Sequence, residues 1–113
     1  MLRLTIVLLL IGVLAGCQTP GSVGPAPPLP AGVTFEGGDG SSAESAVTIR
    51  GAHELTGVDA EYAWLAQHFP GYRVRGQSVK QQGKKTYDVI EITTRKSAAK
   101  QVHFDISDFS GKF

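Results

Sequence analysis

Hydrophobic and polar positions follow three different patterns along the chain, and each pattern predicts a different kind of segment. Residues 4–14 form an uncharged, mostly apolar run behind Arg3, which is the only charged residue before Glu36. As a helix this run reaches only about 16 Å, about half of a bilayer core, so it is too short to span a membrane. A short apolar run behind a positive charge is typical of a secretory signal peptide, which we assign to residues 1–16.

Between residues 56 and 70 the apolar positions follow a helical period. They are spaced by four, three and four residues, which places them on one face of a helix; they are Val58, Tyr62, Leu65 and Phe69. Thr56 and Asp59 fit a capping box at the start, and Pro70 ends the element. Trp64 lies beside this stripe, so we expect it at the edge of the sheet or partly exposed.

After Gly71 the apolar positions alternate with a period of two, which predicts strands. The expected strands are residues 46–50 before the helix and residues 72–80, 86–94 and 101–107 after it. Turn-forming residues separate the last three near 82–85 and 97–99. We therefore expect a single small α+β domain over residues 43–113. Its order is β-α-β-β-β, an antiparallel meander with one helix packed on the sheet.

Residues 17–42 have a different composition from the segments on either side. Five prolines and six glycines lie between residues 19 and 42, and few side chains there are large enough to build a core. Proline lacks a backbone donor and glycine carries no side chain, so neither a helix nor a sheet is favoured. We predict a disordered tether that connects the signal region to the domain.

The end of the apolar run carries a specific motif, Leu14-Ala15-Gly16-Cys17, which contains the only cysteine of the chain. It resembles the lipobox of bacterial lipoproteins. The resemblance implies cleavage between Gly16 and Cys17 and attachment of palmitate-type acyl chains to Cys17. Gln18 stands where an inner-membrane retention signal has Asp, so the resemblance implies the outer membrane, with the domain facing the periplasm. Two or three acyl chains give a durable anchor.

The remainder of the chain, from residue 38 to 113, resembles a group of small secreted and lipid-anchored bacterial proteins. The shared stretches are residues 38–42, 60–65, 70–71, 87–89 and 104–107. This resemblance implies a folded domain and transfers no activity.

Charge is distributed unevenly, although 11 basic and 10 acidic side chains nearly balance. The small net charge argues against nucleic acid as a partner. Residues 71–100 nevertheless hold eight basic and two acidic side chains. A basic strand surface suits an envelope protein, an anionic lipid or a cell-wall polymer, or is simply a solvated face. The candidate binding residues are Arg73, Arg75, Lys84 and Lys85, together with Trp64.

Residues able to carry out catalysis or hold a metal are sparse. No two of the three histidines have a metal-ligand spacing, and no nucleophile lies in a strand-turn-helix elbow, so we expect no cofactor, no metal and no enzyme. The main hypothesis is a lipid-anchored envelope protein that binds another macromolecule. The alternatives are a small enzyme or ligand carrier, with His103 and Asp105 as its polar pair, and a structural spacer.

The lipobox predicts that Cys17→Ser abolishes incorporation of an alkyne-tagged palmitate in cells, because the acyl acceptor is the thiol. Ser22→Ala, which lies outside the motif, should leave the labelling unchanged. Click labelling of the immunoprecipitated protein measures both. Labelling that persists in Cys17→Ser would contradict the lipidation of this residue.

Overall fold

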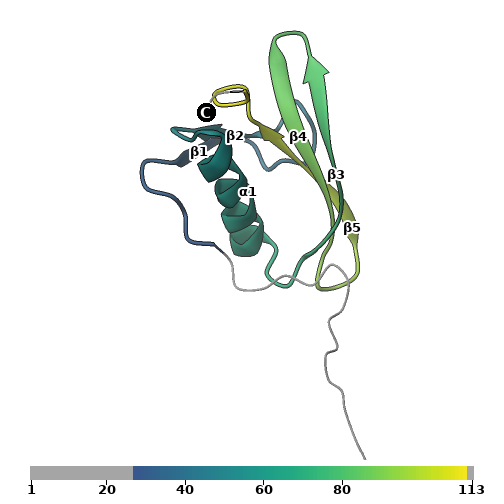
Figure 1. Ribbon diagram of the computed structural model, residues 1–113. Helices are drawn as coiled ribbons and strands as arrows, with labels where there is room; N and C mark the ends of the chain where they lie inside the picture. The colour runs from purple at the N-terminus through teal and green to yellow at the C-terminus, as the bar shows by residue number, and fades with distance from the viewer. Residues whose placement is uncertain (1–26, 112–113) are drawn as a thin grey trace, which may run out of the picture.

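The computed structural model describes residues 27–111, in which one helix accompanies five strands (Figure 1). The helix α1 spans Glu54–His68. The strands are β1 (Thr34–Gly37), β2 (Val47–Arg50), β3 (Arg73–Gln82), β4 (Lys85–Thr93) and β5 (Ala99–Asp105). The predicted α+β class is confirmed, and so is the order of the last five elements. The signal region 1–16 lies outside the described residues.

The five strands form one mixed sheet in the order β1-β2-β5-β4-β3. The last three strands make the expected antiparallel meander, with Ile90 opposite both Gln77 and Val102. β2 joins the other side of β5 in a parallel pair, with Val47 opposite Phe104. This pairing is parallel because α1 returns the chain to the end where β2 began. β3, and β5 two reversals later, therefore run in the direction of β2.

The main core lies between α1 and the sheet. Its fully buried side chains come from four elements and include Ile49, Leu65, Ile90, Ile92 and Phe104. Trp64 stands edge-on to Phe104, with ring centroids 5.5 Å apart and an interplanar angle of 89°. This is a favoured aromatic geometry, and it fixes the helix against the central strand.

The opposite face of β4 and β5 is covered by the segment between β1 and β2. Ala46 packs with Tyr87 and Val89, and the carbonyl of Gly40 accepts a 2.7 Å bond from the His103 N–H. Gly40 has a φ of 82°, and a Cβ atom there would lie 2.8 Å from Val102. Only glycine allows so close an approach of the two backbones.

The domain begins before Ala43, the boundary that the composition predicted. β1 pairs with β2 in antiparallel fashion, with Phe35 opposite Ile49, and Val33 is buried just ahead of it. The predicted tether, residues 17–42, is therefore too long at its C-terminal end; residues 17–26 lie outside the described part. The four residues of β1 lie among glycines and have little strand propensity of their own. Pairing with β2 is what stabilises them as a strand.

The helix differs from its prediction in start and in rotation. It begins at Glu54 with His53 as its N-cap, three residues before the cap expected at Thr56. Thr56 Oγ1 accepts a bond from the His53 N–H. The buried stripe is Gly57, Ala60, Glu61, Trp64 and Leu65, whereas Val58 is 45% exposed. The helix is rotated because the small residues at 57 and 60 allow close packing, which brings the large ring of Trp64 into the core.

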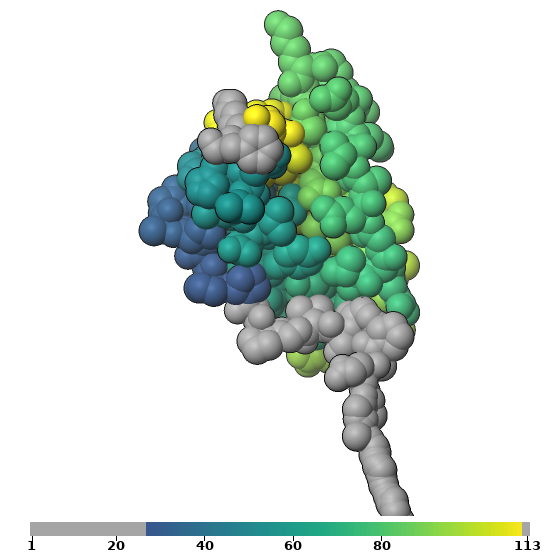
Figure 2. Space-filling model, viewed as in Figure 1, coloured from purple at the N-terminus to yellow at the C-terminus, as the bar shows by residue number. Residues whose placement is uncertain are grey.

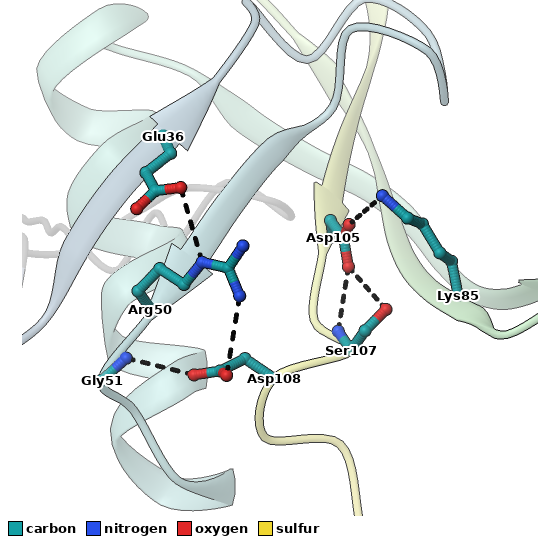
Figure 3. A network of polar contacts seen from close by, with 7 residues as sticks. All are labelled: Glu36, Arg50, Gly51, Lys85, Asp105, Ser107 and Asp108. Atoms are coloured by element: carbon teal, nitrogen blue, oxygen red, sulfur yellow. Dashed lines mark hydrogen bonds and ion pairs between the residues drawn. The ribbon is translucent and has the colours of Figure 1, made fainter.

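Two polar clusters connect the C-terminal segment to the sheet (Figure 3). Arg50 lies 3.5 Å from Glu36 and 3.7 Å from Asp108, and Asp108 also accepts a bond from the Gly51 N–H. These contacts join β1 to β2 and connect the end of β2 to the C-terminal turn. The second cluster, around Asp105, joins β5 to β4 and belongs to the residues considered below.

The close contact between α1 and the C-terminal turn generates a stability prediction. A Cβ atom at Gly57 would collide with the ring of buried Phe109. Gly57→Ala should therefore lower the free energy of unfolding by about 1–3 kcal/mol, although alanine is the better helix former. The exposed Gln67→Ala should change it by less than about 0.5 kcal/mol. Urea unfolding measures both; a stabilised Gly57→Ala would contradict the packing.

Candidate functional site

The structure separates the residues that the sequence grouped into one binding surface. Arg73 and Arg75 lie at the start of β3, whereas Lys84 and Lys85 lie at the turn after its end. Ten strand residues span roughly 30 Å, so the two pairs do not act as one patch. Gly16 and Cys17 lie outside the described residues.

Trp64 is not available for binding, contrary to the expectation that it lies at the edge of the sheet or partly exposed. Its side chain is only 5% exposed, and it lies between Phe104 and the ring of His68, which stacks on it at 3.9 Å. The sequence placed Trp64 beside the buried stripe because the stripe was assigned one position away from its true place. The ring is a structural anchor of α1.

Arg73 and Arg75 instead join other cations at one end of the sheet. We call this surface the basic end; its members are Arg73, Arg75, Arg95, Lys96 and Lys100, all of which are exposed. Arg75 is the extra residue of a bulge between Val74 and Gly76, and its Nε donates to Thr93 Oγ1 at 3.0 Å. The bulge turns the Arg75 side chain toward β4.

The basic end is hollowed between its arginines. A pocket of about 240 Å³ is lined by Arg73, Arg75 and Arg95, with Gly71, Thr93, Thr94 and Ser97 completing the wall. A second hollow, of about 270 Å³, lies on the other side of Arg95 and is lined by His68, Phe69, Pro70, Thr94 and Lys96. Arg95 lies two residues after the end of β4, so the pairing of Arg73 with Thr93 is what brings it here. The sequence showed the charge of Arg95 but not its position beside Arg73.

The second exposed feature is the free side of β3. Among residues 27–111 this strand pairs only with β4, and from Gln77 onward all its residues are exposed (green in Figure 2). The turn at Gly83 and Lys84 has two residues, so Gln82 and Lys85 form a hydrogen-bonded pair. Such pairs alternate along an antiparallel ladder. The N–H and C=O groups of Gln77, Val79 and Gln81 therefore point away from β4; we call these three residues the open edge.

His103 and Asp105, the polar pair of the enzyme alternative, are both buried. His103 Nδ1 lies 3.1 Å from the Gly40 carbonyl, and Asp105 accepts a 2.6 Å bond from Ser107 and lies 3.4 Å from Lys85 (Figure 3). Burial raises the pKa of Asp105, but the bonds from Ser107 and Lys85 outweigh burial, so its pKa lies below the ordinary value. Both side chains hold the fold together and face no cleft.

A pair of carboxyl groups is buried between α1, β3 and β4. Glu61 is 1% exposed and hydrogen-bonds to Asp88, which also accepts two bonds from Gln77 Nε2, at 2.8 and 3.0 Å. Burial, the bond to Asp88 and the negative charges of Asp88 and Glu54 raise the pKa of Glu61 to about 10. Glu61 is therefore a neutral acid at physiological pH.

Tyr62 lies near the carboxyl pair, and Tyr72 lies near Tyr62. Burial raises the pKa of both Tyr62 and Tyr72, and among residues 27–111 the only buried side-chain oxygens without a hydrogen-bond partner are Tyr72 Oη and Glu61 Oε1. With Glu61 1% and Asp88 5% exposed, no substrate reaches the pair. Its position is that of a core network rather than an active site.

The described residues contain no group of three His, Cys, Asp or Glu side chains that could hold a metal ion. The single helix within this range is neither long nor apolar enough to cross a bilayer.

Comparisons with protein-family models, with curated proteins and with solved structures find no match for this chain.

The buried acid makes stability depend on pH. The pKa of Glu61 is about 10 in the folded chain and about 4.5 in the unfolded chain. The stability that protonated Glu61 contributes is therefore complete below pH 4.5 and is lost as the pH rises toward 10. Glu61→Gln keeps a donor for Asp88 without an ionisable group. We expect its gain in unfolding free energy over the native chain to be about 1–4 kcal/mol larger at pH 8 than at pH 5.

Urea unfolding at the two pH values measures this difference. Glu44→Gln, at an exposed position, is the matched control and should give none. An advantage of Glu61→Gln that is the same at both pH values would contradict a neutral buried Glu61.

Proposed function

We propose that this protein is a lipid-anchored, non-enzymatic binding protein of the bacterial envelope, held through Cys17 in the outer membrane and facing the periplasm. The motif Leu14-Ala15-Gly16-Cys17 behind a short apolar run supports the anchor. Catalysis is not favoured, because the polar groups considered for it are either buried or spread over the surface.

The observation that carries the binding role is the open edge of β3. Exposed strand edges are normally protected by charges, prolines, bulges or short length, since each is a template for another strand. The bulge at Arg75 protects the first part of β3 in this way, and the opposite edge strand, β1, has only four residues. From Gln77 to Gln82 the strand is regular, contains no proline and carries one charge, Lys80.

The partner that fits this edge is an extended peptide segment of another envelope protein, added as a sixth strand. Main-chain hydrogen bonds to Gln77, Val79 and Gln81 would supply affinity, and the side chain of Val79, 65% exposed, offers an apolar contact. Lys80 and Lys84 flank the edge, so acidic residues in the partner would be favoured. Lys85 is occupied by its contact with Asp105.

Val79→Pro tests this proposal, because proline removes the outward N–H without removing a bond to β4. In-cell crosslinking of the full lipidated chain, followed by mass spectrometry, should capture a defined envelope protein. The yield of that product should fall at least about tenfold in Val79→Pro, as expected when a strand addition is blocked.

Val79→Ala is the matched control, since it removes the same side chain and keeps the N–H. It should retain most of the crosslinked product. Equal loss in both variants would assign binding to the side chain and refute strand addition. An unchanged yield in both variants would refute the open edge as the binding site.

A further inference from the structure

The folded N-terminal segment shortens the link between Cys17 and the domain. The composition placed the start of the domain at Ala43, whereas Val33 is already buried and residues 34–46 pair with or cover the sheet. The described chain starts at Pro27, ten residues after Cys17. Even fully extended, ten residues reach only about 35 Å. An anchor at Cys17 therefore holds the domain within about one domain length of the bilayer.

The chain enters the domain toward the basic end. In Figure 1 the dark blue start of the described chain lies level with the C-terminal end of α1. The turn between β4 and β5 lies at this same end of the molecule, and the tip of the β3–β4 hairpin lies at the opposite end. The short link thus brings the basic end, rather than the hairpin tip, toward the anchor.

The charges at this end favour an anionic surface. Five exposed cations, the members of the basic end, are accompanied by two carboxylates, Glu91 and Asp39. Glu91 is already bonded to Gln101 at 3.2 Å, and Asp39 accepts bonds from the N–H and hydroxyl of Ser41. Both carboxylates are thus engaged within the domain.

The hollow of about 240 Å³ between Arg73, Arg75 and Arg95 suits a phosphate group in particular. Guanidinium groups bind phosphate through paired hydrogen bonds, and three of them converge here. The Arg95 side chain packs against Gly71, whose φ of 83° and missing Cβ leave room for it. Arg95 is thereby positioned by Gly71, and Arg75 by its bond to Thr93 Oγ1.

We propose that the basic end docks onto the anionic phospholipid headgroups of the leaflet that holds the acyl chains of Cys17. The inference rests on the proposed lipidation of Cys17. Docking orients the domain so that β3 runs away from the bilayer, which leaves the hairpin tip and the open edge accessible to a partner. The anchor keeps the surface near its ligand, so contacts that are weak individually suffice.

Energy transfer to labelled headgroups tests the orientation. The lipidated protein, with Ala98→Cys or Gln82→Cys carrying a donor dye, is reconstituted into vesicles of phosphatidylethanolamine with one-quarter phosphatidylglycerol. Both positions are exposed, and they lie at opposite ends of the sheet. We expect stronger transfer from Ala98→Cys than from Gln82→Cys. In phosphatidylcholine vesicles, or in molar salt, only the smaller difference that the short link sets should remain.

Paired charge reversals identify the surface. Arg73→Glu with Lys96→Glu should reduce the difference between the two labels to the value seen in neutral vesicles. Lys80→Glu with Lys84→Glu changes the net charge equally at the other end and should leave the difference intact. Equal effects of the two reversals, or an effect of neither, would overturn docking through the basic end.

Vesicle flotation separates this inference from the proposed function. Protein that does not float with vesicles lacks the anchor, which overturns both proposals. Protein that floats but gives the same difference between the labels in anionic and in neutral vesicles keeps the anchor and overturns the docking alone.

Discussion

The whole architecture depends on the burial of β5 on both of its faces. Val102 to Asp105 are all buried, and this strand lies between β2 and β4 at the centre of the sheet. A strand of this kind needs a cover on each side. The helix, through Trp64 and Leu65, supplies one, and the backbone around Gly40 supplies the other. Residues 33–46 are therefore part of the domain, despite their glycine-rich composition.

This arrangement determines which polar groups remain available for function. His103 and Asp105 alternate with the core residues of β5 and would face solvent on a one-sided sheet. The second cover buries them and turns them into structural contacts. On β3, which is an edge strand, no other segment of the described residues covers the outer residues. The exposed chemistry of the protein is consequently concentrated there and at the adjoining ends of β4 and β5.

The helix shows how packing outweighs a simple apolar stripe. A stripe through Val58 and Tyr62 satisfies the period, but the observed helix buries Gly57, Ala60 and Glu61. Small residues permit close approach, and the energy gained by placing Trp64 against Phe104 exceeds what Val58 would have gained. Burying the carboxyl group of Glu61 costs free energy. This cost is reduced because Glu61 is protonated and hydrogen-bonds to Asp88.

For the residues that the structure describes, the sequence alone determined the helix, the meander and the α+β class, because each is encoded in local periodicity and turn residues. The signal-like N-terminus stays a prediction. The sequence also identified Arg73, Arg75, Lys84 and Lys85 as charged and exposed. Only the tertiary structure decided which of them act together, since strand pairing moves Arg95 to Arg73 and separates the lysines. It also decided the rotation of α1 and the membership of β1, because both depend on contacts between residues far apart in the chain.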